Sequence, residues 1–198
     1  MLFEEINRRL CGHPITNVDI TAVLKLILTS YFSSAENITH PQLKNRIYTD
    51  SPQTGIIIES SGAFLPTEAE KRPAVLIKRD TWKVDQSGVL GGYEQGSNPA
   101  NFTRFIQGAH AIICIGKTPG ETDLLGDEVF RLFCHITPLL LNYSCLDTFR
   151  VLELSPIKPI QEGRSHYQAV VSLFYRFTDK WTIDIVESTP TTTTTESP

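Results

Sequence analysis

Basic side chains are scarce in this 198-residue chain, which has 18 lysines and arginines against 22 acidic residues and a formal net charge of −4. Tight binding to nucleic acid requires clustered cations, so we do not expect DNA to be a tight ligand. The hydrophobic fraction of 40% and the charged fraction of 20% are typical of a folded globular domain.

The sequence also lacks an apolar run that could cross a membrane. Its most apolar stretch, residues 18–32, is interrupted by polar side chains such as Asp19 and Lys25. The first ten residues carry two glutamates and two arginines and are not followed by an apolar segment, so we expect no signal peptide. These patterns predict a soluble protein with no membrane partner.

Cysteine is rare, and its spacing excludes the usual metal motifs. Cys11, Cys114, Cys134 and Cys145 form no CxxC pair, and the five histidines form no HxH or HxxxH pair. We therefore expect neither a metal nor a cofactor. All four cysteines are predicted to be buried free thiols of a reducing compartment, with Cys114 and Cys134 as small core residues.

One short sequence looks like part of a phosphate-binding loop. Gly116-Lys117-Thr118 matches the end of the pattern GxxxxGK[ST], but the position of its first glycine holds Ala111. The residues between form an apolar strand rather than a loop whose backbone N–H groups could bind phosphate. The sequence therefore does not predict a nucleotide site.

A cysteine hydrolase would need a thiol and an imidazole within hydrogen-bond reach of each other. The candidates are Cys114, Cys134, Cys145, His110, His135 and His166. Nothing in their spacing selects a pair, and structural histidines explain the pattern. The carboxylate pairs Asp123 with Asp127 and Asp127 with Glu128 are explained by a helix start. We expect no enzyme activity and no catalytic residues, and keep a small α+β enzyme such as a cysteine hydrolase as the alternative.

Two stretches have the three- and four-residue apolar spacing of amphipathic helices. The first covers residues 17–33, and Thr16 or Asn17 is expected to cap its start. The second covers residues 123–140, and Pro138 is expected to kink or end it.

Apolar runs rich in β-branched or alternating residues predict strands. These are residues 56–58, 74–78, 105–115, 149–154 and 167–177. The run at 74–78 is apolar on both faces, so we expect it to be covered on both sides or central, and the odd-numbered residues of 167–177 are expected to face the core. The element order predicts one α+β domain over residues 1–187, with a mixed, mainly antiparallel sheet and amphipathic helices packed on one face.

Two segments differ in composition from this predicted domain core. Glycine and proline are concentrated in residues 84–104, which we predict to be a long Gly-rich loop of the functional or flexible kind. Residues 188–198 are almost entirely threonine, proline and serine, and we predict a low-complexity tail.

The order of these elements resembles the tail terminator and head-tail joining (neck) proteins of tailed bacteriophages. The resemblance covers about residues 15–180 and rests on element order rather than on a chemical motif. The matching elements are the first amphipathic helix, the strand at 74–77, the variable loop, the strand at 110–115, the helix at 123–140 with Leu-Leu-Gly-Asp-Glu-Val-Phe at 124–130, and the strands at 149–154 and 167–177.

This resemblance implies a structural virion protein, made in the host cytoplasm, that forms a homo-oligomeric ring, commonly a hexamer, at the head-proximal end of the tail. Its partners would be tail tube and head-tail connector proteins, and DNA would pass through the lumen without specific binding. Ring closure needs heterologous interfaces, and we expect Val89, Leu90, Tyr93 and Phe102 to contribute to them. A binding module that recruits a partner by strand addition is a further alternative.

Overall fold

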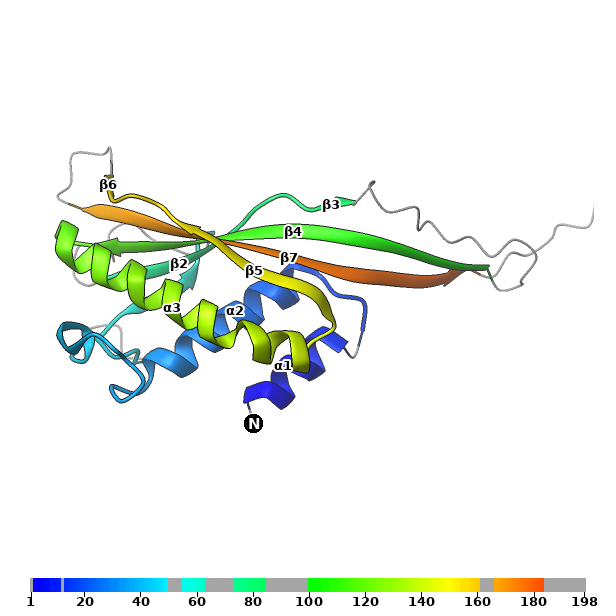
Figure 1. Cartoon of the computed structure of the whole chain (residues 1–198), viewed down its shortest axis with the longest axis horizontal. Coiled ribbons are helices and arrows are strands. Elements are labelled where there is room, and N and C mark those ends of the chain that lie inside the picture. The colour runs from blue at the N-terminus through cyan, green and yellow to red at the C-terminus, as the bar shows by residue number, and fades with distance from the viewer. Residues whose placement is uncertain are drawn as a thin grey trace, which may run out of the picture.

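The computed structural model of the chain describes residues 2–11, 13–49, 55–62, 73–84, 100–160 and 166–183. Within them it confirms the predicted α+β class: α-helices lie on one side of a mixed, mostly antiparallel sheet (Figure 1). None of the described helices is both long and apolar enough to cross a membrane.

The helices are α1 (Leu2–Cys11), α2 (Asn17–Phe32) and α3 (Pro119–Tyr143), and a short 3-10 helix covers Pro41–Leu43. The strands are β1 (Ile57–Ser60), β2 (Ala74–Arg79), β3 (Lys83–Val84), β4 (Ala100–Gly116), β5 (Leu146–Leu154), β6 (Lys158–Pro159) and β7 (Tyr167–Ile183). The order across the sheet is β1-β2-β4-β7-β5, with β3 beside β4 and β6 beside β7. β1 and β2 run parallel, and the other pairs are antiparallel.

The start of α2 is fixed by a reciprocal cap. The Thr16 hydroxyl accepts a hydrogen bond from the Asp19 backbone N–H, and the Asp19 carboxylate accepts one from the Thr16 backbone N–H at 2.9 Å. This arrangement satisfies two backbone donors that the helix itself leaves unpaired. The predicted helix over 17–33 is confirmed, and Thr16 is its N-cap.

Helix α3 is longer at both ends than the predicted 123–140. It begins at Pro119, after Thr118 accepts the Glu121 N–H, because proline has no N–H to leave unpaired in the first turn. Of the two expectations for Pro138, a kink or the end of the helix, the second is wrong, because α3 continues to Tyr143. Pro138 and Cys134 both lie on the exposed side, where water can solvate the carbonyl that the proline leaves without a donor.

The main core lies between the sheet and the helices. On β7, Val171, Leu173, Tyr175 and Phe177 are at most 1% exposed, which confirms that its odd-numbered residues face the core. A smaller apolar cluster on the opposite face contains Ile57, Ala74, Leu76 and Ile115. Strand β2 is therefore covered on both faces, as its sequence predicts.

The predicted C-terminal boundary of the loop over 84–104 is wrong, because the strand after it begins at residue 100. Residues 100–104 belong to β4, where pairing with β7 satisfies their backbone groups. Phe102 therefore lies in a strand rather than in a loop. Val89, Leu90 and Tyr93 lie outside the described residues, as do the rest of that loop from 85 to 99 and the predicted tail at 188–198.

The prediction of four free thiols is also wrong. Cys11 at the end of α1 and Cys145 just before β5 form a disulfide, with their Cα atoms 5.4 Å apart. Cys114 is buried in the core as expected, but Cys134 is exposed because it lies on the face of α3 that points away from the sheet. The spacing of 134 residues between the bonded cysteines gave no sign that the fold brings them together.

Candidate assembly surface

The longest feature of the molecule is the antiparallel pair of β4 and β7, each of 17 residues. Their register runs without interruption from Ala100 opposite Ile183 to Gly116 opposite Tyr167. β5 pairs with β7 only as far as Phe177, and β3 pairs with β4 only at residues 106 and 107. Residues 100–105 and 178–183, called the ribbon below, are therefore two-stranded in the described structure, and they project beyond the helices (Figure 1).

The ribbon has two edges that no described strand covers. Arg104 and Asp179 form an ion pair at 3.4 Å across it, and the backbone register places Phe102 opposite Trp181. Each edge of such a ribbon presents backbone N–H and C=O groups that can pair with another strand. A two-stranded ribbon is marginally stable by itself in water, so a third strand would stabilise this one.

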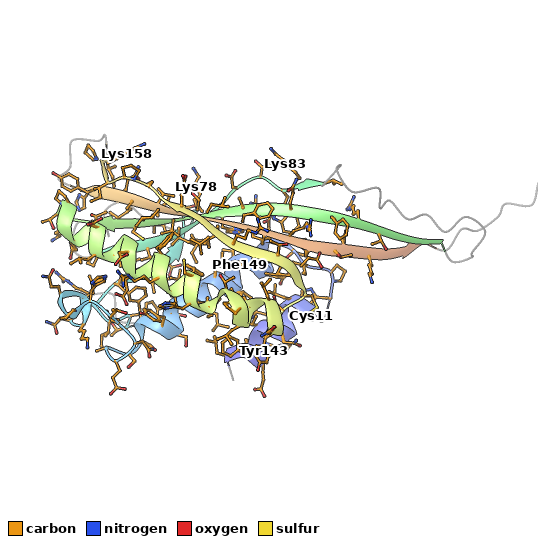
Figure 2. The ribbon with its side chains drawn as sticks, viewed as in Figure 1. Cys11, Lys78, Lys83, Tyr143, Phe149 and Lys158 are labelled. Atoms are coloured by element: carbon orange, nitrogen blue, oxygen red, sulfur yellow. A yellow bond between two sulfur atoms is a disulfide. The ribbon has the colours of Figure 1, made fainter. Side chains whose placement is uncertain are left out.

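The sheet face opposite the helices, called the helix-free face, carries four large apolar side chains on its two central strands. Phe105, Ile113, Val170 and Phe174 on β4 and β7 are half-buried there. The Arg176 guanidinium lies 5.2 Å from the centre of the Phe105 ring. Figure 2 shows Lys78, Lys83 and Lys158 on the same side of the sheet.

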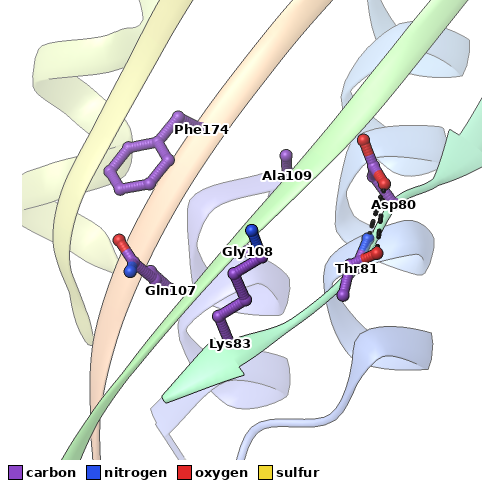
Figure 3. A pocket seen from close by; sticks show the side chains of 7 residues that line it. All are labelled: Asp80, Thr81, Lys83, Gln107, Gly108, Ala109 and Phe174. Carbon is purple, nitrogen blue, oxygen red and sulfur yellow. Dashed lines mark hydrogen bonds between the residues drawn. The ribbon is translucent and has the colours of Figure 1, made fainter. Parts of the chain in front are cut away.

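A hollow of about 290 Å³ on this face is lined by Asp80, Thr81, Lys83, Gln107, Gly108, Ala109 and Phe174 (Figure 3). The Thr81 N–H donates to the Asp80 carboxylate at 2.7 Å. The lining has no nucleophilic thiol and no histidine, so the hollow offers a contact surface rather than the parts of a hydrolase site.

On the face of the sheet that the helices cover, His110 is part of a buried hydrogen-bond network. Its Nε2 lies 2.9 Å from the Thr21 hydroxyl, and its Nδ1 lies 3.1 Å from the Tyr175 hydroxyl. The same tyrosine oxygen accepts the Trp82 indole N–H at 2.7 Å. Gly108 permits this contact, because a Cβ there would meet the Trp82 ring at 2.6 Å. A neutral imidazole satisfies both neighbours, which identifies His110 as a structural histidine.

His110 makes the stability of the fold depend on pH. Burial, and secondarily the nearby Arg79 charge, lowers the pKa of His110 to about 4, against about 6.5 in an unfolded chain. The unfolded state therefore binds the proton more readily, and acidification favours unfolding. Between pH 7.5 and pH 5 we expect the free energy of unfolding to fall by about 2 kcal/mol through this residue.

Urea unfolding at several pH values measures this effect. His110→Gln should reduce the dependence, whereas His135→Gln, at an exposed position of α3, should leave it unchanged. An equal pH dependence in the His110 variant and the wild type would contradict the assignment.

Glu128 on α3 is a fully buried carboxylate that holds the chain after α2 in place. It accepts the Thr39 N–H at 2.6 Å and the His40 N–H at 3.1 Å, as well as the Tyr31 hydroxyl. Its neighbour Asp127 is partly exposed and contacts the His40 ring at 2.8 Å. The sequence pattern explained these carboxylates by the helix start, but Glu128 has a specific role in packing.

The candidate thiol and imidazole residues do not form the proposed pairs. Cys145 is bonded to Cys11, and Cys114 Sγ donates to the Leu125 carbonyl at 3.9 Å. Complete burial raises the pKa of Cys114 to about 12, which makes it a poor nucleophile. Both ring nitrogens of His110 are engaged by hydroxyl groups.

The Gly116-Lys117-Thr118 turn is closed by the protein itself. It connects β4 to α3, and the Lys117 N–H donates to the Glu121 carboxylate at 3.0 Å. Thr118 accepts the Glu121 N–H, so the turn uses its polar groups to begin the helix rather than to surround a phosphate.

A cleft of about 610 Å³ lies between α2 and the ends of β1 and β2, and is called the α2–β1 cleft below. Lys25, Lys78 and Arg79 are the cationic residues of its lining, which contains no acidic residue. The side chains of Arg79 and Lys78 alternate on β2, so that of Arg79 lies on the α2 side and that of Lys78 on the helix-free face. Lys25 is paired with Glu59 at 2.7 Å, whereas Arg79 makes no ion pair within the described part of the chain. Val18, 71% exposed, adds an apolar contact to the lining.

Among the described residues, no group of three or more histidine, cysteine or acidic side chains is arranged to hold a metal ion. The surfaces that stand out are the ribbon, the helix-free face and the α2–β1 cleft. No family model and no curated protein matches this sequence.

Proposed function

We propose that this chain is a structural subunit of a tailed bacteriophage particle, a tail terminator or head-tail joining protein that forms a ring at the head-proximal end of the tail. The ribbon carries the proposal, because a two-stranded extension whose edges no described strand covers suits contact with a second subunit. The α+β fold with helices on one face agrees with the element order on which the resemblance rests.

The shape of the subunit favours a contact between unlike surfaces. The ribbon is the far end of the central strands β4 and β7 (Figure 1), whereas β1 is an edge strand of the sheet. When one surface of a subunit meets a different surface of the next, rotation can close a ring. The half-buried apolar residues of the helix-free face would add buried area in such an assembly.

The proposed partners are further copies of this chain, tail tube proteins and head-tail connector proteins, with DNA passing through the ring. The proposed location is the virion, after synthesis in the host cytoplasm. The Cys11–Cys145 disulfide fits a released particle, because oxidising surroundings preserve such bonds.

The alternative of a cysteine hydrolase has less support. Cys114 is buried, and Cys134 is exposed with no histidine hydrogen-bonded to it among the described residues. Cys145 is in a disulfide and has no thiol. Strand addition to a partner peptide uses the same open edges as self-assembly, and the oligomeric state distinguishes these two readings.

Native mass spectrometry and negative-stain images of the purified chain across a concentration series test the proposal. We expect a closed ring in the wild type, and mainly monomers for Phe102→Asp and Trp181→Asp, because a charge on the ribbon opposes its burial. Leu152→Asp is the matched control, since Leu152 is 58% exposed on β5, outside the ribbon. A wild type that stays monomeric at all concentrations would contradict the ring.

A further inference from the structure

We propose that the α2–β1 cleft binds residues 184–187 of a second copy of the chain. This inference rests on the proposed self-assembly and identifies one of its contacts. The observations that carry it are the unpaired cation in the cleft, the acidic and apolar sequence that follows β7, and the distance between the two within one subunit.

The cleft is suited to an acidic segment with apolar side chains. Arg79 is exposed and makes no ion pair among the described residues, and it lies close enough to His110 to lower the pKa of that imidazole. The register places Arg79 opposite His110, which contacts α2 through Thr21, so Arg79 lies on the α2 side of the sheet. Val18 and Ala22 supply apolar contacts beside it.

The sequence that continues from β7 has the complementary chemistry. Residues 184–187 are Asp, Ile, Val and Glu, and residues 181–198 contain no lysine, arginine or histidine. Two carboxylates flank two β-branched residues, a combination that favours extended backbone beside a strand. β1 is the first strand of the sheet and pairs only with β2, so no described strand covers its outer edge.

Distance excludes binding within the same subunit. Ile183 is paired with Ala100, and Arg79 is paired with His110, so ten residues of β4 (110 − 100) separate the two positions. At about 3.4 Å per residue this is roughly 34 Å along the strand. Four residues span at most about 14 Å, so residues 184–187 cannot reach their own cleft. Strand β7, which precedes this segment, ends in the ribbon beyond the helices, away from the cleft of its own subunit (Figure 1).

Charge reversal tests the contact by sedimentation velocity, with the dissociation constant between subunits as the readout. Arg79→Glu should raise that constant at least about tenfold, and so should the double variant Asp184→Lys with Glu187→Lys. Combining all three substitutions should restore it to within about threefold of the wild type, because the attraction is rebuilt with opposite signs. Lys44→Glu, an exposed lysine outside the cleft, controls for the change in net charge.

A labelled peptide with the sequence of residues 181–190 tests the same contact without a ring. Fluorescence anisotropy should show binding to the full chain and a loss of at least about tenfold with Arg79→Glu. If the wild type is monomeric but binds the peptide through Arg79, the proposed ring is contradicted and the proposed cleft contact is supported. If rings form but Arg79→Glu changes neither assembly nor peptide binding, or the triple variant is not restored, the cleft contact is overturned and the ring stands.

Discussion

Replacement of Glu128 by alanine is expected to lower the free energy of unfolding by about 3–5 kcal/mol. Its carboxylate accepts two backbone N–H groups, those of Thr39 and His40, and the Tyr31 hydroxyl, in a site with no solvent exposure. The alanine leaves these donors without an acceptor, and each buried unsatisfied donor costs about 1–3 kcal/mol. Urea unfolding followed by circular dichroism measures the loss.

Asp127 provides the matched control, because it is the preceding residue on the same helix. Its carboxylate is about one-third exposed and contacts Arg131 and the His40 ring. Asp127→Ala should cost no more than about 1 kcal/mol, since partly solvated ion pairs contribute little. Glu128→Gln keeps one acceptor oxygen and should give an intermediate loss. Equal losses at positions 127 and 128 would show that the buried carboxylate has no special role.

Loss of the Cys11–Cys145 disulfide is expected to lower the free energy of unfolding by about 2–4 kcal/mol. The bond joins residues 134 positions apart, so it restricts a long segment of the unfolded chain. For a chain of this size the midpoint of thermal unfolding should fall by about 5–15 °C. Scanning calorimetry of Cys11→Ser and Cys145→Ser, each with its remaining thiol alkylated, checks this value.

Reducing agent offers an independent test, because both bonded cysteines lie at exposed positions. It should lower the unfolding temperature of the wild type to that of the serine variants and leave the variants unchanged. Cys134→Ser controls for removal of an exposed thiol. Four reactive thiols in the unreduced wild type would contradict the disulfide.

Much of the fold could be predicted because its local patterns are strong. The apolar spacing of α2 and the capping residue Thr16 identified that helix, and the strict alternation over residues 167–177 identified most of β7 and its core face. Helix α1 was not predicted, although Glu5 pairs with Arg8 and Arg9 at the spacing expected on a helix. Its short length gave only a weak signal.

The assembly surfaces depended on contacts between distant segments. Residues 100–104 look like loop by composition, and they form a strand because residues 178–183 lie beside them in register. Position also decided the roles of single residues: Glu128 is buried while Asp127 is not, although both follow from the same local sequence.

The sequence by itself determined the α+β class, the helix at 17–32 and the core-facing residues of β7, because each follows from periodicity along a short stretch of chain. Only the tertiary structure decided that Cys11 meets Cys145, that β4 and β7 extend into a ribbon, and that Arg79 faces a cleft without an acidic partner in the described lining. These features arise when residues far apart in the chain come together, and such proximity leaves no periodic mark in a single sequence.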